Sequence, residues 1–344
     1  MYKMFKLENI IRKNIINLTP YSSAREEFKE EATILLDANE NPFETALNRY
    51  PDPFQTALKK ELSIIKRVES NQIFIGNGSD EAIDLLFRAF CEPGKDKSYV
   101  FPPTYGMYEV SANINNIETV KISLDSDFQL PHINELVETI DSNGLLFICS
   151  PNNPTGNIYS LNAVKEIAAV FSGLVIVDEA YIDFSSSESA ISLLNELPNL
   201  VVLNTLSKAY GLAGLRLGMA FASKEIIAVI NKIKPPYNVN SISQIEGLKA
   251  LKNTKKSLSQ IDLLKSERTL LTEALYAIPS VIKVYPSEAN FLLIEFDQSD
   301  KIFVSLKSKG IIVRNRTKEV KNCLRITVGT PEQNRILINA IKEI

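Results

Sequence analysis

Residues 145–150, Leu-Leu-Phe-Ile-Cys-Ser, form a short apolar run that predicts a buried strand. Similar runs follow at 174–177 (Leu-Val-Ile-Val) and 200–204 (Leu-Val-Val-Leu-Asn), separated by segments with a helical pattern at 161–171 and 190–197. Short, β-branched strands that alternate with helices are typical of strand–helix–strand units in a parallel sheet. The sequence therefore predicts an α/β fold in which helices flank a mostly parallel central sheet.

The same pattern begins earlier in the chain and changes in the last third. A strand is expected at 72–75, and a helix with one apolar face at 79–90. After about residue 230, Lys234-Pro235-Pro236 interrupts the alternation, and a long charged helix is expected at about 242–277. Strand-like segments follow at 281–285, 291–294, 311–313 and 324–327. They predict a second, smaller α+β domain packed on the first.

The two patterns divide the chain into three regions. Basic residues alternate with isoleucines before Leu18, which indicates an amphipathic arm or a first helix. The boundaries that we expect are 1–40 for the N-terminal arm with part of the small domain, 41–240 for the large domain and 241–344 for the small C-terminal domain.

The composition excludes several classes of protein. The 344 residues carry 38 basic and 41 acidic side chains, a net charge of −3, so there is no chain-wide basic field for nucleic-acid binding. No stretch approaches the ~20 apolar residues that a membrane span requires. The three cysteines are far apart, and the single histidine, His132, cannot form a histidine-rich metal site. We expect a cytoplasmic protein with reduced cysteines, no metal and a small, locally charged ligand.

Polar residues follow the three central strands at the points where the strands end. Asn153, Asp178 and Lys208 lie at intervals of about 25 and about 30 residues, each close to one strand–helix–strand unit. Ligands of open α/β sheets bind at the carboxyl ends of the strands. The sequence therefore predicts that an amide, a carboxylate and an amine meet at one edge of the sheet.

A fourth strand end, Gly76-Asn-Gly-Ser-Asp-Glu81, precedes the helix expected at 79–90. Glycines let the backbone approach a ligand closely, and the free N–H groups of a helix start bind anions. The alternative is a capped helix, with Ser79 as N-cap and two acidic residues complementing the helix dipole. A phosphate site, a carboxylate, an amide and a lysine together are what pyridoxal phosphate requires.

The segment around Lys208 also carries a family resemblance. Residues 205–218, Thr-Leu-Ser-Lys-Ala-Tyr-Gly-Leu-Ala-Gly-Leu-Arg-Leu-Gly, match the lysine signature of the fold-type-I pyridoxal-phosphate aminotransferases. Two more motifs of that family match at 150–156 and 177–181, in the expected order. Further segments resemble the histidinol-phosphate aminotransferases in particular, at 18–21, 37–42, 49–51, 103–106 and 324–330. The resemblance implies a fold-type-I transferase with a large cofactor-binding domain and a smaller α+β domain.

The resemblance also implies roles for individual residues. Lys208 would form the Schiff base with the cofactor and move the proton at the substrate carbon, and Asp178 would pair with the pyridinium nitrogen. Asn153 and Tyr181 would bond the ring oxygen, and Tyr105 would stack on the ring. The groups expected around the cofactor phosphate are the backbone at Ser79 and Asp80, with Thr205, Ser207 and Arg216. Tyr50 would reach the cofactor of a second subunit, which implies a homodimer.

The anionic end of the substrate has its own expected partners. An arginine that interrupts a strand, such as Arg325 or Arg314, needs an anionic partner, either a carboxylate of the protein or a ligand. The resemblance implies that these two arginines bind the phosphate of histidinol phosphate or a carboxylate of glutamate, with Tyr21 and Asn39 closing over it.

The expected activity is transfer of an amino group from glutamate to imidazole-acetol phosphate. This step gives histidinol phosphate and belongs to histidine biosynthesis. The alternatives are an aromatic or broad-range aminotransferase, a decarboxylase of a phosphorylated amino acid that uses the same cofactor, and a catalytically idle regulator. The regulator would be indicated by loss of the lysine or the aspartate, and Lys208 and Asp178 are both present.

Overall fold

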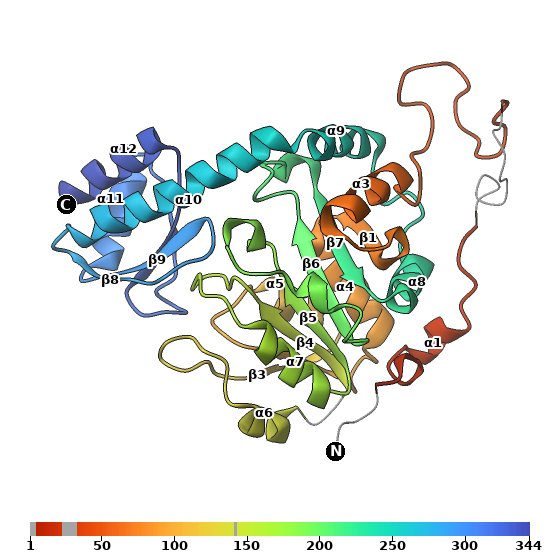
Figure 1. Cartoon of the computed structure of the whole chain (residues 1–344), viewed down its shortest axis with the longest axis horizontal. Coiled ribbons are helices and arrows are strands. Elements are labelled where there is room, and N and C mark those ends of the chain that lie inside the picture. Colours follow the sequence, from red (N-terminus) through yellow and green to blue (C-terminus); the bar gives the residue numbers. More distant parts are fainter. Residues whose placement is uncertain (1–4, 23–32, 141–142) are drawn as a thin grey trace.

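A seven-stranded sheet forms the centre of the larger part of the molecule. The computed structural model describes residues 5–22, 33–140 and 143–344 (Figure 1). In spatial order the strands are β1 (Ile73–Asn77), β7 (Leu217–Ala222), β6 (Leu200–Thr205), β5 (Leu174–Asp178), β4 (Gly144–Cys149), β2 (Lys97–Val100) and β3 (Glu118–Lys121). The neighbours from β6 to β3 pair in parallel, whereas β7 is antiparallel to both β6 and β1. The α/β class and the mostly parallel sheet predicted from the sequence are confirmed.

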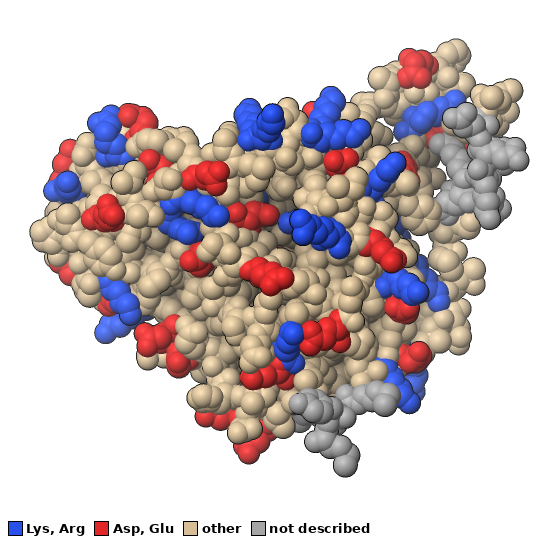
Figure 2. Space-filling model, viewed as in Figure 1, with Lys and Arg blue, Asp and Glu red and all other residues tan. Residues whose placement is uncertain are grey.

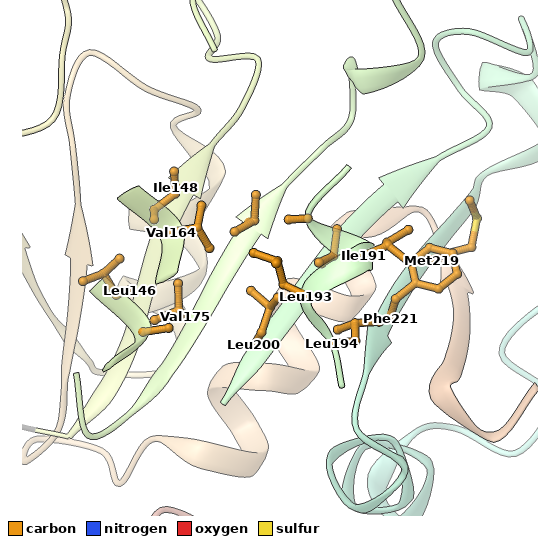
Figure 3. Close-up of a cluster of buried hydrophobic side chains, with 14 of the residues drawn as sticks. Leu146, Ile148, Val164, Val175, Ile191, Leu193, Leu194, Leu200, Met219 and Phe221 are labelled. Atoms are coloured by element: carbon orange, nitrogen blue, oxygen red, sulfur yellow. The ribbon is translucent and has the colours of Figure 1, made fainter. Parts of the chain in front are cut away.

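Helices cover both faces of this sheet because its strands are apolar on both sides. One face, which includes Leu146, Val175 and Phe221, packs against α3 (Thr56–Lys66), α6 (Ile133–Thr139), α7 (Leu161–Val170) and the 3₁₀ turn η4 (Ala190–Leu193). Figure 3 shows these side chains near Val164 of α7, Ile191 and Leu193 of η4, and Leu194 directly after it. The other face packs against α4 (Ser79–Phe90), α5 (Met107–Ile114) and α8 (Lys224–Ile233). Neighbouring strand residues such as Leu145 and Leu146 therefore belong to different cores.

A four-stranded antiparallel sheet forms the smaller part of the molecule. Its strands run in the order β10 (Arg314–Asn315), β11 (Cys323–Thr327), β9 (Phe291–Phe296) and β8 (Val281–Val284). The helices of this part are α10 (Thr254–Tyr276), α11 (Ser299–Ser308) and α12 (Pro331–Lys342). They bury Leu324 and Ile326 of β11 in a core of their own. Figure 1 shows α10 running from the helices of the large sheet towards the small sheet.

Four local expectations differ from the structure. The single helix expected at 242–277 is two, α9 (Ser241–Lys252) and α10, because Asn253 has a non-helical backbone with φ of −125°. The strand expected at 311–313 begins only at Arg314, because the pairing with β11 starts there. The helix expected at 190–197 is the shorter turn η4. Gly78, not Ser79, is the N-cap of α4, and Ser79 is its first residue.

The described residues before α3 contain little regular structure. They include the turn η1 (Leu7–Asn9) and the short helix α1 (Lys13–Ile16), so the expected first helix is only a single turn. The described residues from 33 onwards then form a loop that extends away from the body of the molecule before α3 (Figure 1). Figure 2 shows lysine and arginine side chains interspersed with acidic ones on the face that it displays. Among the described residues, no helix is long and apolar enough to cross a membrane.

Candidate active site

The N-terminus of α4 forms one wall of a cavity at the carboxyl edge of the large sheet. Gly78 precedes the helix with φ of 87°, a conformation that suits glycine. Gly218 of β7 lies against this turn, and a Cβ at that position would stand 2.0 Å from the Ser79 backbone nitrogen. The glycine therefore lets the strand pack directly on the helix start. The cavity is lined there by Gly78, Ser79 and Asp80, whose first-turn N–H groups are suited to bind an anion.

Arg216 and two hydroxyl groups line the same end of the cavity. The Nη2 atom of Arg216 lies 3.7 Å from Asp80 Oδ2. Ser207 donates its backbone N–H to Thr205 Oγ1 (3.1 Å), and the hydroxyls of these two residues lie 3.0 Å apart. A guanidinium, two hydroxyls and a helix N-terminus together make a set of donors that matches a phosphate group.

Asp178 lies at the end of β5 with only 3% of its surface exposed. Its Oδ2 accepts a hydrogen bond from the Tyr108 hydroxyl (2.6 Å), and its Oδ1 accepts one from the Ala180 N–H (3.1 Å). Burial raises the pKa of Asp178 above the ordinary value, while these two hydrogen bonds act in the opposite direction. These two hydrogen bonds therefore hold the carboxylate in one orientation in the wall of the cavity.

Lys208 follows β6 and projects its amine into the same cavity. Its Nζ lies 5.6 Å from the centre of the Tyr181 ring, which itself packs edge-on against Phe291 of the small sheet. Burial lowers the pKa of Lys208, and the positive charges of Arg325 and Arg216 lower it further. A lowered pKa increases the share of neutral amine at a given pH, and a neutral amine can attack a carbonyl or accept a proton.

Residues of the two sheets meet directly beside this lysine. Arg325 of β11 donates a hydrogen bond from Nη1 to Asn153 Oδ1, and its guanidinium lies 5.2 Å from the Phe291 ring centre. On the other side, the Tyr105 hydroxyl donates to Asp80 Oδ1 (3.1 Å). The small sheet therefore supplies a cation to the edge of a cavity that the large sheet builds.

The structure brings most of the sequence-predicted residues together. The residues that line the cavity include all those expected around a cofactor except Tyr50: Ser79, Asp80, Tyr105, Asn153, Asp178, Tyr181, Thr205, Ser207, Lys208 and Arg216. Tyr50 is instead half exposed, and its ring stacks on Tyr237 at 4.4 Å in a separate hollow.

The residues expected to bind substrate are more dispersed. Arg325 contacts Asn153 at the cavity edge, and Arg314 lies directly opposite Arg325 in the β10–β11 pair. Tyr21 is 68% exposed, and neither it nor Asn39 is among the residues that line the cavity. The two arginines are therefore neighbours, whereas the structure does not bring Tyr21 and Asn39 to them.

Tyr108 is a residue of the site that the sequence reasoning missed. It is fully buried in α5, and its ring stacks on Phe147 of β4 at 4.5 Å. Its spacing of three residues from Tyr105 is the only local signal, and such a spacing is common in ordinary core helices. Only the packing of α5 on the sheet places its hydroxyl against Asp178.

Three comparisons relate this chain to known proteins. Residues 17–341 match the family model of class I and II aminotransferases. The histidinol-phosphate aminotransferase of Christiangramia forsetii is 50% identical over 99% of this chain and 99% of its own length. That of Parabacteroides distasonis is 49% identical, with the same coverage of both chains. Among solved structures, the histidinol-phosphate aminotransferase of Clostridium acetobutylicum has a TM-score of 0.77 at 24% identity, over 86% of this chain and 90% of that one. This structural likeness agrees with the fold described above.

Proposed function

The chain belongs to the class I and II aminotransferases, and on that premise we propose that it is a pyridoxal-phosphate enzyme that makes histidinol phosphate. It would move an amino group from glutamate to imidazole-acetol phosphate, leaving 2-oxoglutarate, as a step of histidine biosynthesis. The observation that carries this proposal is the meeting of Lys208, Asp178 and the α4 N-terminus in one cavity. The full-length similarity to histidinol-phosphate aminotransferases supports the choice of substrate.

The residues of the cavity fit pyridoxal phosphate group by group. The close approach of Gly218 to Ser79 forms a cradle that a Cβ would fill, and it leaves the first-turn N–H groups of α4 for the phosphate. Arg216, Ser207 and Thr205 add donors at the same end. Lys208 supplies the amine and Asp178 the carboxylate that the aldehyde and the ring nitrogen require.

Each residue has a distinct task toward the bound group. When bound, pyridoxal phosphate supplies an aldehyde that condenses with amines and a protonated ring that accepts electrons from the substrate carbon. Burial opposes the ionisation of Asp178. A protonated ring nitrogen beside it would stabilise the carboxylate form. Tyr181 and Asn153 would hold the ring oxygen, and Tyr105 would cover the ring face.

Lys208 has two tasks in this scheme. Its lowered pKa increases the share of neutral amine, which would attach the cofactor and, once released by substrate, would move the proton between the substrate carbon and the cofactor. Tyr181 lies against this amine and limits the directions from which it can approach. One group could serve both half-reactions, because each requires a proton to move only between the substrate carbon and the aldehyde carbon of the cofactor, on the two sides of one nitrogen.

Arg325 and Arg314 would bind the anionic end of each substrate. That end is a phosphate in histidinol phosphate and a carboxylate in glutamate, and a planar guanidinium pairs well with both. Tyr21 and Asn39 would close over it. Because Tyr21 is largely exposed, its part in the site requires a movement of the N-terminal segment or a contact from a second chain.

We also propose that the active unit is a homodimer in the cytoplasm. The segment before α3 extends from the body with large apolar side chains exposed, among them Leu36 and Phe43. Tyr50 on this segment lies outside its own cofactor cavity, so it would serve the cavity of the partner. Exposed apolar patches of this kind are typical of protein–protein interfaces.

The test of the proposal is the absorbance spectrum of the purified protein together with its kinetics. The protein with added pyridoxal phosphate is expected to show a visible band that borohydride traps on Lys208, and Lys208→Ala should lack it. A colourless protein that gains no band would refute the use of this cofactor.

Substrate kinetics then separate the remaining alternatives. We expect a higher kcat/KM with imidazole-acetol phosphate than with phenylpyruvate, which separates this enzyme from an aromatic or broad-range aminotransferase. Release of carbon dioxide from a phosphorylated amino acid would instead identify a decarboxylase.

A further inference from the structure

Three arginines lie on one face of the β10–β11 pair. Arg314 is directly opposite Arg325 in the antiparallel register. The Arg316 N–H donates to the Cys323 carbonyl (2.9 Å), which continues the ladder by one more pair, and alternate residues of a strand point to the same face. Arg314, Arg316 and Arg325 therefore share the face opposite to the one that carries the buried Leu324 and Ile326.

This arrangement is unfavourable unless an anion binds to it. Like charges directly opposite each other destabilise a strand pair. Among the residues that the structure describes, the side chain of Arg314 has no hydrogen bond or ion pair, and that of Arg325 has one hydrogen bond, to the neutral Asn153. The Nε atoms of Arg325 and Arg316 are buried without a hydrogen-bond partner. Donors held in this way on one face are suited to receive an anionic ligand.

Arg316 differs from the other two because it has a carboxylate partner. Its Nη1 donates to Glu319 Oε1 (3.1 Å), three residues along the chain, and its side chain is 18% exposed against 42% for Glu319. An ion pair with so exposed a partner contributes about 0–1 kcal/mol. The pair is therefore strong enough to orient the guanidinium and weak enough for a more highly charged anion to displace Glu319.

The position of Arg316 places it beside the cofactor cavity. It lines a second cavity with Thr104, Tyr105 and the ion pair between Lys121 and Glu109 (2.8 Å). Tyr105 separates this cavity from the one that contains Lys208, because it lines both. The charge of Arg316 reaches across this boundary: burial raises the pKa of Tyr181 and Arg316 acts against that rise, whereas burial lowers the pKa of Arg325 and Arg316 acts in the same direction.

Resting on the proposed function, we propose that Arg316 determines specificity: it supplies a third positive charge that a substrate phosphate needs and a substrate carboxylate does not. A phosphate monoester carries a charge of about −1.5 to −2 near neutral pH and presents three acceptor oxygens. A carboxylate carries a single charge and two oxygens, which Arg325 and Arg314 can satisfy. Arg316 would therefore favour histidinol phosphate while it leaves glutamate nearly unaffected.

The experiment compares the two amino donors in separate half-reactions of the holoenzyme. L-Histidinol phosphate and L-glutamate are each mixed with the wild type, Arg316→Gln and Arg316→Lys, and the loss of the cofactor's visible band is followed. For Arg316→Gln we expect kcat/KM with histidinol phosphate to fall about 10- to 100-fold, the effect of one charge-assisted hydrogen bond. The value for glutamate should change less than about threefold, because a carboxylate is satisfied by two guanidinium groups. Arg316→Lys, which keeps the charge and loses the fork, should recover part of the loss.

Arg335→Gln is the matched control. Arg335 also pairs with a glutamate three residues away, Glu332 at 2.7 Å, but the pair lies on the exposed face of α12. Removal of the Arg335 charge should leave kcat/KM unchanged with both amino donors. Equal losses with both donors in Arg316→Gln, or no loss with either, would overturn the proposal.

A binding measurement separates this inference from the proposed function. Inorganic phosphate is titrated calorimetrically into each holoenzyme, in which the cofactor already occupies its own phosphate site. We expect the Kd to rise at least about tenfold in Arg316→Gln and to stay unchanged in Arg335→Gln. If the wild type does not convert histidinol phosphate, the proposed function is wrong. The phosphate Kd of the wild type, compared with that of Arg316→Gln, still tests whether Arg316 binds phosphate. An equal Kd in the wild type and Arg316→Gln would refute it.

Discussion

Replacing Tyr108 by phenylalanine removes one oxygen atom from a fully buried position. The lost hydroxyl donates to Asp178 Oδ2 at 2.6 Å, and the ring that carries it remains stacked on Phe147. Phenylalanine keeps that stacking, so the change leaves the shape of α5 and β4 intact. What it removes is a hydrogen bond to the carboxylate that we expect to hold the cofactor ring nitrogen.

The size of the effect follows from that hydrogen bond. A hydrogen bond to a charged group is worth about 1.5–3 kcal/mol, and more of this is lost where water cannot replace the donor. Because this bond favours the charged carboxylate, its loss raises the pKa of Asp178 further above the ordinary value. Burial already raises this pKa and the Tyr108 hydroxyl opposes that rise, so the variant loses one of the influences that hold the pKa down, while the Ala180 N–H still acts against burial.

Two measurements test this reasoning. The first is the Kd for pyridoxal phosphate, followed by absorbance, which should rise about 10- to 100-fold because the carboxylate form that pairs with the ring is less stable. The second is the pH dependence of kcat/KM with glutamate. The acid limb of this profile should move to higher pH, because the raised pKa leaves Asp178 protonated at higher pH.

Tyr159→Phe is the control for removal of a buried tyrosine hydroxyl. The Tyr159 hydroxyl donates to the neutral Phe128 carbonyl at 3.1 Å, and Tyr159 does not line the cofactor cavity. This variant should lose about 1 kcal/mol of stability and keep the wild-type pH profile. If Tyr108→Phe matched the wild type within twofold in Kd and kept the same acid limb, the hydrogen bond to Asp178 would have no functional role.

Two further predictions concern the cradle and the buried carboxylate next to Asp178. Gly218→Ala should weaken cofactor binding at least about tenfold and cost roughly 1–3 kcal/mol of stability, because its Cβ would stand 2.0 Å from the Ser79 nitrogen. Gly214→Ala, where an added Cβ meets nothing within 4 Å, should change neither quantity in cofactor titration and urea denaturation. Burial raises the pKa of Glu179 from 4.5 to about 7, so the folded apoenzyme binds a proton there that the unfolded chain has released. The free energy of unfolding of the wild type relative to Glu179→Gln should therefore fall by roughly 3 kcal/mol as the pH rises from 4.5 to about 7, and a constant difference in urea denaturation would contradict the raised pKa.

Local pattern was enough to predict the elements that present the chemistry. The strands that end near Asn153, Asp178 and Lys208 were located within one or two residues, because short, unbroken apolar runs that alternate with helical segments are typical of buried parallel strands. The helix at 79–90 was located at its observed bounds, because apolar periodicity and an acidic first turn both lie in the local sequence. The residues that line the cofactor cavity followed from these elements and from the family motifs.

Other features depend on contacts between distant parts of the chain. Strand β7 was not predicted, although it lies between β1 and β6 and is antiparallel to both. Its position depends on Gly218, whose missing side chain matters only once the strand packs on the α4 N-terminus. The break at Asn253 and the late start of β10 likewise depend on neighbouring elements, because helical and strand propensities there do not decide between the alternatives.

The sequence by itself determined which groups could act on a cofactor, since an amine, a carboxylate and an amide at parallel strand ends must lie at one edge of the sheet. Only the tertiary structure decided which other side chains contact these groups. The hydroxyl of Tyr108 reaches Asp178, and Arg325 reaches Asn153 across 172 residues of sequence. Arg316 joins Arg314 and Arg325 on one face through the pairing of β10 with β11. The periodicity of apolar residues predicts whether a residue is buried. It does not predict which residue the buried side chain contacts, because that contact is set by packing between elements that are distant in the sequence.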